Sequence, residues 1–171
     1  MLLNKYFQKP LFWDYSICSL ICVISLYLHK KQILDLPAAN DSISVTTDVT
    51  TIGLTLSGFI LTLLTVLITF KSSSRIKKIE PENSETIFNL FFASPYYFET
   101  VKHLKNCIKS LIFVAVVGFG IKLFLNQSFK SYAFFFNEIG LTIIILTIWR
   151  CMLILSKILD FQKEEDDKMR K

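Results

Sequence analysis

The 171-residue chain has few of the residues that build reaction centres or tight turns: five glycines, four prolines, four cysteines and two histidines. It contains no glycine-rich phosphate-binding loop, no Gly-Xaa-Ser-Xaa-Gly elbow and neither a His-Glu-Xaa-Xaa-His nor a Cys-Xaa-Xaa-Cys motif. No nucleophile, base and orienting group can be assembled from its motifs. We therefore expect a protein that is not an enzyme, with no catalytic residue, no cofactor and no metal.

The cysteines and histidines fit this expectation. Cys18, Cys22, Cys107 and Cys151 fall in or beside apolar segments and not in an expected outer loop, so a structural disulfide is not predicted. Cys18 and Cys22 are one helical turn apart, but the sequence offers no second ligand pair for a metal. We expect both histidines, His29 and His103, at an interface or on the surface.

Charge is also scarce over long stretches. Charged residues make up 19% of the chain and hydrophobic residues 52%, and most of the charges lie between four apolar blocks. About 20 apolar residues in a helix cross a bilayer core of ~30 Å. The sequence thus predicts an all-α polytopic protein, a single membrane domain with four transmembrane helices. The predicted spans are 11–28, 49–70, 108–125 and 133–158.

The first block has the basic start of a cleaved signal peptide. Its apolar run is longer than usual, however, and His29-Lys30-Lys31 follows in place of a small-residue cleavage site. We therefore expect it to remain as a transmembrane helix.

Basic residues predict the orientation of the chain. With the N-terminus inside, thirteen of the 19 lysines and arginines fall in inner segments, three in outer loops and three inside the blocks. Cytoplasmic segments carry such an excess. Both termini are therefore expected in the cytoplasm, at the inner (plasma) membrane. The net charge of +5 then requires no nucleic-acid partner.

Residues 71–106 form the one sizeable inner segment. Its basic start, 71–78, should lie against anionic headgroups, and a short apolar helix is expected over 87–92. Ser94-Pro95 is typical of a helix start, and an apolar stripe from Tyr97 to Leu111 predicts one helix from Pro95 to about Leu125 that begins in the cytoplasm. It is either a solvated basic extension or a docking surface for a cytoplasmic partner or a neighbouring protomer. The candidate surface consists of Arg75, Lys77, Lys78, Tyr97, Val101 and Leu104.

The second span carries a stripe of small and hydroxyl side chains at alternating spacings of four and three residues. Lipid does not drive helices together, so close backbone approach and interhelical hydrogen bonds must. The stripe is therefore either a packing face, within the bundle or between subunits, or the lining of a pore in an oligomer. It comprises Thr51, Thr55, Gly58, Thr62, Thr65 and Thr69, and we call it the threonine stripe.

The other spans each have one smaller or more polar face, expected to turn inward. In the first span this face holds Asp14, Cys18, Cys22, Ser25 and His29; in the third, Cys107, Ser110, Val114, Gly118 and Ile121; in the fourth, Asn137, Gly140, Ile144, Thr147 and Cys151.

Four charges lie inside the apolar blocks, where an unpaired charge is costly. The third and fourth spans are joined by a short loop, so Lys122 and Glu138 should lie at similar depth and form an ion pair. Asp14 is expected to pair with Arg150, with Lys109 as the competing partner. These pairs either set the helix register or form a charged gate or proton relay.

The layout resembles that of the small four-helix membrane proteins of prokaryotic antiviral defence loci, such as the membrane subunit of the Kiwa system and accessory membrane proteins of some RNA-targeting CRISPR loci. The resemblance covers the whole chain: four spans, a second span rich in Thr and Gly over 53–69, a basic hairpin over 71–105 and no catalytic set. It implies an oligomer that senses or permeabilises the membrane together with a cytoplasmic protein partner.

We therefore expect a homo-oligomeric sensor or effector subunit, with a tetramer favoured. An ion channel or pore lined by the threonine stripe is the first alternative. A small transporter is the second, although the chain lacks the internal repeats on which many transporters are built.

Overall fold

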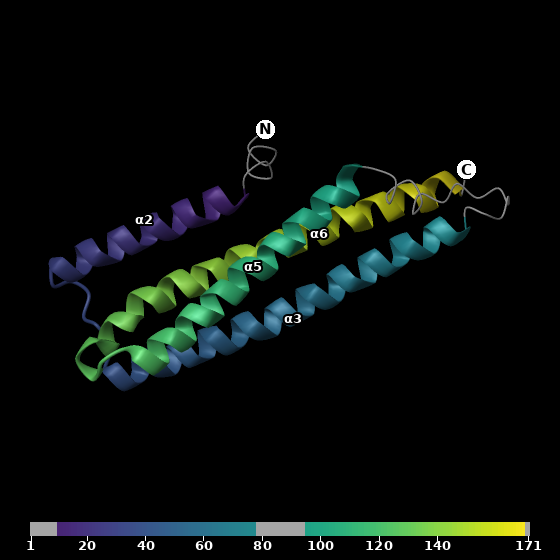
Figure 1. The fold of residues 1–171 in the computed structure, drawn as a ribbon. Coiled ribbons are helices and arrows are strands. Elements are labelled where there is room, and N and C mark those ends of the chain that lie inside the picture. The colour runs from purple at the N-terminus through teal and green to yellow at the C-terminus, as the bar shows by residue number, and fades with distance from the viewer. Residues whose placement is uncertain (1–9, 78–94, 170–171) are drawn as a thin grey trace.

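A computed structural model describes the backbone of residues 10–77 and 95–169, and the side chains of residues 10–72 and 97–156. Within these ranges every regular element is a helix (Figure 1), which confirms the all-α prediction for this part of the chain. The elements in chain order are α2 (Pro10–Lys30), α3 (Ala39–Lys77), α5 (Pro95–Phe124), the 3-10 helix η1 (Gln127–Tyr132) and α6 (Ala133–Met169).

Two short connections lie at one end of the bundle, which we call the η1 end (Figure 1). After α2, Gln32 adopts a left-handed conformation with φ of 58°, and the Ile33 N–H donates to the Leu28 carbonyl at 3.1 Å. This Schellman pattern satisfies carbonyl groups that a helix end leaves unpaired. η1 turns the chain between α5 and α6, and these two helices are antiparallel neighbours, as expected from their short link.

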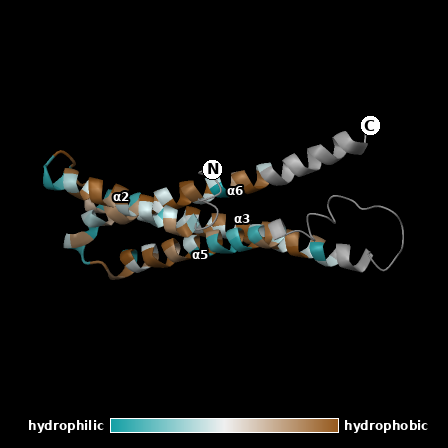
Figure 2. Cartoon of the chain, turned by 90° about the horizontal axis from the view of Figure 1, so that it is seen from above, coloured by the Kyte–Doolittle hydropathy of each residue, from teal (hydrophilic) through white to brown (hydrophobic). Residues whose placement is uncertain are grey.

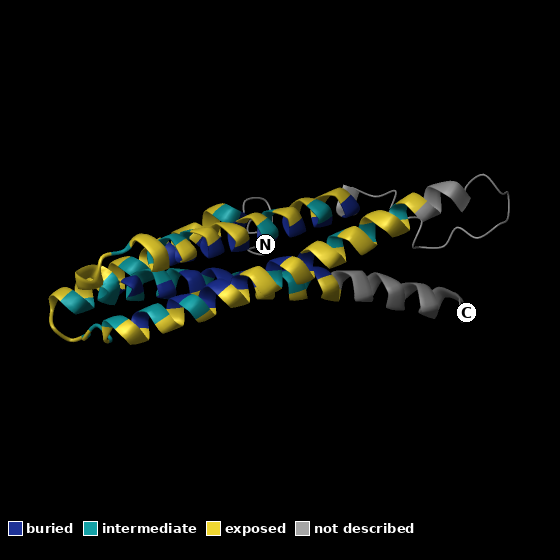
Figure 3. Cartoon of the chain, turned by 60° about the horizontal axis from the view of Figure 1, so that its bottom comes forward, coloured by how far each residue is buried: buried dark blue, intermediate teal, exposed yellow. Residues whose placement is uncertain are grey.

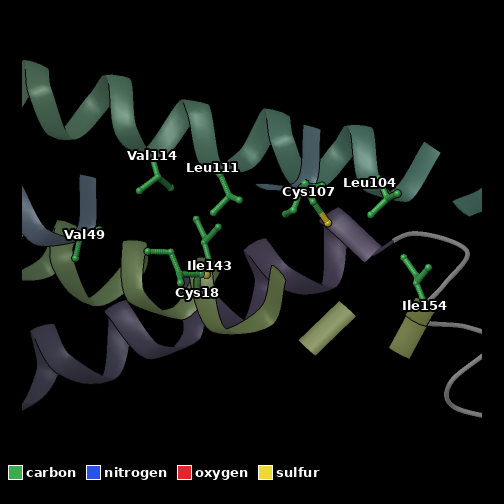
Figure 4. Close-up of a cluster of buried hydrophobic side chains, with 10 residues drawn as sticks. Cys18, Val49, Leu104, Cys107, Leu111, Val114, Ile143 and Ile154 are labelled. Atoms are coloured by element: carbon green, nitrogen blue, oxygen red, sulfur yellow. The ribbon is translucent and has the colours of Figure 1, made fainter. Parts of the chain in front are cut away.

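The longest contact in the bundle is between α3 and α5, and α6 packs against both. α2 lies mainly on α6, at the edge of this three-helix unit. Figure 4 shows side chains from all four helices meeting along the centre of the bundle. This core consists of Cys18, Val49, Ile60, Leu104, Cys107, Leu111, Val114, Ile143, Ile144 and Ile154.

Two glycines permit the close approach of α3, α5 and α6. A Cβ at Gly140 of α6 would lie 2.7 Å from Val49 Cγ1 and 3.3 Å from Val114 Cγ1. A Cβ at Gly118 of α5 would collide with Thr50 Oγ1. Small residues at these points let helix backbones pack closely, which is the main source of association between helices in lipid.

The helix ends differ from the predicted spans where the sequence is polar. α3 begins at Ala39 and not at Val49, because Ser42 and Thr46 are buried against the bundle and extend its packed face. The segment between the first two predicted spans, 29–48, is therefore helical from Ala39 onward and not a loop throughout. α5 runs from Pro95 to Phe124, which agrees with the helix predicted from Pro95 to about Leu125. Within the described part of the chain, four helical segments are long and apolar enough to cross a membrane: Pro10–Lys30, Ala39–Ser72, Tyr97–Phe124 and Gln127–Ser156.

The outer surface of these helices carries many large apolar side chains. Buried residues form narrow stripes and exposed residues cover the outward faces (Figure 3), while Figure 2 shows hydrophobic positions on the same helices. Phe59, Leu123 and Trp149 are 72%, 73% and 63% exposed. Apolar surface in water costs ~25 cal/mol per Å², so an exterior of this kind is suited to lipid and not to water.

The tight contact at Gly140 gives a first test of the bundle. We expect Gly140→Ala to lower the free energy of unfolding by about 1–3 kcal/mol, because the new methyl group must displace Val49. The measurement is reversible unfolding in mixed micelles with an anionic detergent, followed by circular dichroism. Gly120→Ala is the matched control, since a Cβ at Gly120 meets nothing within 4 Å. Equal effects of the two substitutions would contradict the packing described.

Candidate functional site

A buried ion pair joins α2 to α6. The Arg150 guanidinium contacts the Asp14 carboxylate, and the two side chains are 1% and 7% exposed. The pair predicted from the sequence is thus confirmed, while the competing partner Lys109 is exposed on α5. Arg150 Nη1 also donates to the Cys107 sulfur of α5 at 3.7 Å. One guanidinium therefore links three helices.

Thiols and a histidine lie near this pair in the sequence of the same three helices. Cys18 lies one turn after Asp14 on α2 and is buried, as is Cys107, while Cys151 follows Arg150 directly and is half-buried. All four cysteines are free. His103, one turn before Cys107, is only 6% exposed, so the prediction of a surface position is wrong: it lies on the packed face of α5. Among the described residues, no group of His, Cys, Asp and Glu has the arrangement of a metal site.

A second polar contact joins the same two helices nearer the η1 end. Ser25 of α2 donates its hydroxyl hydrogen to Glu138 Oε1 of α6. The predicted Lys122–Glu138 pair is wrong, because Lys122 lies on the exposed face of α5. Glu138 Oε2 is buried and accepts no hydrogen bond from the part of the chain that the structure describes. The short link between α5 and α6 indicated that Lys122 and Glu138 are at similar heights in the bundle. It did not indicate which face of α5 packs against α6.

The polar face predicted for the first span does turn inward. Its members are buried or half-buried, and the last of them, His29, donates a hydrogen bond from its Nδ1–H to the Leu34 carbonyl at 3.0 Å. The His29 ring also lies edge-on to Tyr132 and Phe135. The attachment of α2 to α6 is therefore largely polar, from the Asp14 end of the helix to the His29 end.

A third polar contact was not found by sequence reasoning. The Asn137 amide of α6 donates to the Ser42 carbonyl and accepts from the Thr46 hydroxyl of α3, both at 2.8 Å. Asn137 had been placed on an inward face, and this is confirmed by its burial. Its partners lie before the predicted start of the second span. The spacing from Ser42 through Thr46, Val49 and Gly53 is the signal that could have located this face.

The threonine stripe does not pack within the bundle. All six of its residues are exposed on the outer face of α3, so the prediction of packing inside the bundle is wrong. Each of the five threonine hydroxyls donates to the carbonyl four residues earlier in α3, at 2.8–3.0 Å. The inward face of α3 is a different one, which includes Thr46, Val49, Gly53 and Ile60. The hydroxyl hydrogens of the threonine stripe therefore need no partner outside α3. The stripe itself is on the surface of the bundle and faces away from the other helices of the described chain.

The predicted partner surface is largely covered by the chain itself. Tyr97 and Leu104 are 4% and 2% exposed, and Val101 is half-buried. α3 continues far enough to cover the start of α5, and the Lys71 ammonium lies 4.0 Å from the centre of the Tyr97 ring. These residues are therefore not a free docking surface. Arg75 and Lys77 belong to α3 but their side chains, with Lys78 and residues 87–92, lie outside the described residues.

Comparison with protein-family models, with curated proteins and with solved structures finds no match to this chain. Its function must therefore be argued from its own contacts. The polar groups described above hold α2 on α6 and α6 on α3, and the exposed groups are the apolar exterior, the threonine stripe and the lysines of α5.

The Asp14–Arg150 pair should behave as a unit. Asp14→Leu or Arg150→Met leaves one buried charge without its partner, so we expect each to lower the free energy of unfolding by about 3–5 kcal/mol. The double variant Asp14→Leu/Arg150→Met removes both charges and should recover most of this loss. Unfolding in mixed micelles measures the cycle, with Glu99→Gln, an exposed acid of α5, as the control. Additive losses in the double variant would refute the coupling.

Proposed function

We propose that the chain is a non-enzymatic, multi-pass protein of the plasma membrane with both termini in the cytoplasm. Four helices of sufficient length and an apolar exterior support the membrane location. The excess of lysine and arginine in the segments 1–10, 71–106 and 157–171 supports the orientation. In this orientation the η1 end faces outward.

Aromatic side chains support a membrane boundary near the ion pair. Trp13 and Tyr15 flank Asp14 in α2, and Trp149 precedes Arg150 in α6. All three aromatic residues are exposed, at 45%, 42% and 63%. Trp and Tyr concentrate at the two membrane–water interfaces. The Asp14–Arg150 pair thus belongs to the cytoplasmic interface and not to the middle of the bilayer.

A second set of aromatic residues lies at the η1 end. Tyr27 is about 21 Å from Trp13 along α2, and Tyr132 precedes α6, whose first residue is about 24 Å from Trp149 along the axis. These separations are somewhat less than the ~30 Å core of a bilayer, so the rings lie just inside the two headgroup layers. α3, α5 and α6 continue past the N-terminal end of α2 (Figure 1), and in this frame their ends extend to the cytoplasmic side.

The exposed threonine stripe supports assembly with further copies of the chain, and this single observation carries the proposal. Small side chains at heptad spacing allow close approach of two helices in lipid. The chain's own bundle leaves this face of α3 open, and a Cβ at Gly58 would meet nothing within 4 Å. We propose that a neighbouring protomer packs there, in a homo-oligomer whose protomers meet through α3.

The role of this oligomer follows from the resemblance in layout to membrane proteins of antiviral defence loci. We propose a sensor or effector subunit that acts with a cytoplasmic partner protein. Because Tyr97 and Leu104 are covered, the partner would contact the ends of α3 and α6 that extend past α2. The proposed contact with the partner is therefore on α3 and α6 and not on the apolar face of α5 that contains Tyr97 and Leu104.

Gly58→Leu tests the assembly without changing the packing inside one protomer. The leucine side chain enters open space on the isolated bundle but blocks a closely packed neighbour. We expect the wild-type protein to be oligomeric in lipid nanodiscs and the variant to shift to smaller species, by mass photometry and chemical crosslinking. Gly120→Leu is the matched control on α5, where no atom would contact the new Cβ. An unchanged oligomer in Gly58→Leu would sink the proposed interface.

A pore lined by the threonine stripe is the second candidate function. The stripe is exposed along α3 from Thr51 to Thr69, so an oligomer that turned this face to a central axis would have a lining of hydroxyl groups. The hydroxyl oxygens remain able to accept hydrogen bonds from water, since each hydroxyl uses its hydrogen within the helix.

Thr55→Val/Thr62→Val separates the pore from the packing interface. Valine keeps the shape of threonine but removes the hydroxyl oxygen. If the stripe only packs, we expect the oligomer and any membrane permeability to be unchanged, because no hydroxyl hydrogen is available to a neighbour. If it lines a pore, ion flux into liposomes should fall at least tenfold with the oligomer intact. No flux from the wild-type protein under any stimulus would exclude the pore.

A further inference from the structure

The outward face of α5 changes its chemistry along the helix. Lys102, Lys105 and Lys109 are spaced by three and four residues, so their exposed side chains lie on one face. Toward the η1 end the same face continues with Phe113 and Val116, which are 60% and 63% exposed. A basic segment thus joins an apolar one on a single helix surface, which we call the lysine face.

Contacts on the other side of α5 determine the depth of this face. Cys107 lies 3.7 Å from Arg150, as measured from its sulfur to Nη1. Lys105 and Lys109 stand two residues to either side of Cys107, about 3 Å along the axis. They are therefore level with Trp149, the neighbour of Arg150, and with the cytoplasmic aromatic boundary proposed above.

The three ammonium groups have no anionic partner among the described residues. None of them takes part in an ion pair within the described ranges 10–72 and 97–156. Asp14, the acid at this depth, is already paired with Arg150. Glu99, the acidic residue of α5, is exposed near the start of the helix. It forms no ion pair with any of these three lysines within the described residues. An exposed ammonium at the edge of the hydrocarbon attracts the anionic headgroups of the cytoplasmic leaflet.

We propose that the lysine face binds the headgroup phosphate of an anionic phospholipid of the cytoplasmic leaflet. The phosphate would lie between Lys105 and Lys109, with Lys102 on its aqueous side. An acyl chain would lie along Phe113 and Val116 toward the middle of the bilayer. Each basic residue near a membrane surface contributes ~1 kcal/mol to attraction of anionic lipid. The inference rests on the proposed membrane location and orientation and adds a lipid class and its binding residues.

The test compares lipid retention by the full-length protein and by Lys102→Gln/Lys105→Gln/Lys109→Gln. Native mass spectrometry and a thermal-shift titration in neutral detergent report binding of phosphatidylglycerol against phosphatidylcholine. We expect the wild-type protein to prefer phosphatidylglycerol. Its affinity should fall about fivefold per lysine removed, roughly a hundredfold for all three. The fold should survive in phosphatidylcholine, because these side chains are exposed.

The matched control is Lys30→Gln/Lys31→Gln/Lys130→Gln, which removes three lysines at the η1 end. It should keep the preference for phosphatidylglycerol, which would separate a specific face from overall charge. Inorganic phosphate is the further arm, and equal stabilisation by phosphate would overturn a lipid site. A triple variant of α5 that keeps the preference, or a wild-type protein that lacks it, would also overturn the inference. Resistance to alkaline extraction reports the membrane location itself, so failure of that proposal is seen separately.

Discussion

The bundle depends on a guanidinium that is almost wholly removed from solvent. Arg150 is 1% exposed, and a charge in such a place is tolerated only with a partner and further hydrogen bonds. The requirement is met by Asp14 of α2 and Cys107 of α5. Because both contacts must form together, they determine how α2 lies along α6 and how deep α5 sits beside them. The aromatic residues next to the pair then share its level, and so do Lys105 and Lys109 of α5.

Elsewhere α3, α5 and α6 approach each other closely because glycine, which has no side chain, lies at their contacts. Gly118 and Gly140 leave room for Thr50 and Val49, so α3, α5 and α6 come close along one line. Asn137 closes the same line near the η1 end with two hydrogen bonds to α3. α2 has no comparable glycine contact and is held by polar groups. The structure thus combines a three-helix unit packed through small residues with a fourth helix attached by an ion pair and a hydroxyl–carboxylate contact, an arrangement in which α2 is the helix most sensitive to changes in charge.

Helical periodicity predicted which residues share a face but not which face turns inward. For α2 and α6 the more polar face was the buried one, and Asp14 and Asn137 were placed correctly. For α3 the same reasoning selected Thr55 and its companions, which are exposed. The difference has a physical cause: threonine in a helix satisfies its own hydroxyl on the preceding turn, so a stripe of threonines carries no demand for a polar partner. Asp14 and Asn137 instead find their partners on another helix.

The sequence by itself determined the four apolar segments, their length and the excess of basic residues at one side, because a bilayer constrains segment length and flanking charge directly. It also indicated that Asp14 needs a basic partner, Arg150 or Lys109, and the structure selects Arg150. Only the tertiary structure decided that Glu138 meets Ser25 while Lys122 faces outward, and that α3 covers Tyr97 and Leu104. It also decided that Lys105 and Lys109 of α5 are level with Trp149. These outcomes depend on the rotation and relative depth of packed helices, which arise from contacts between residues far apart in the chain.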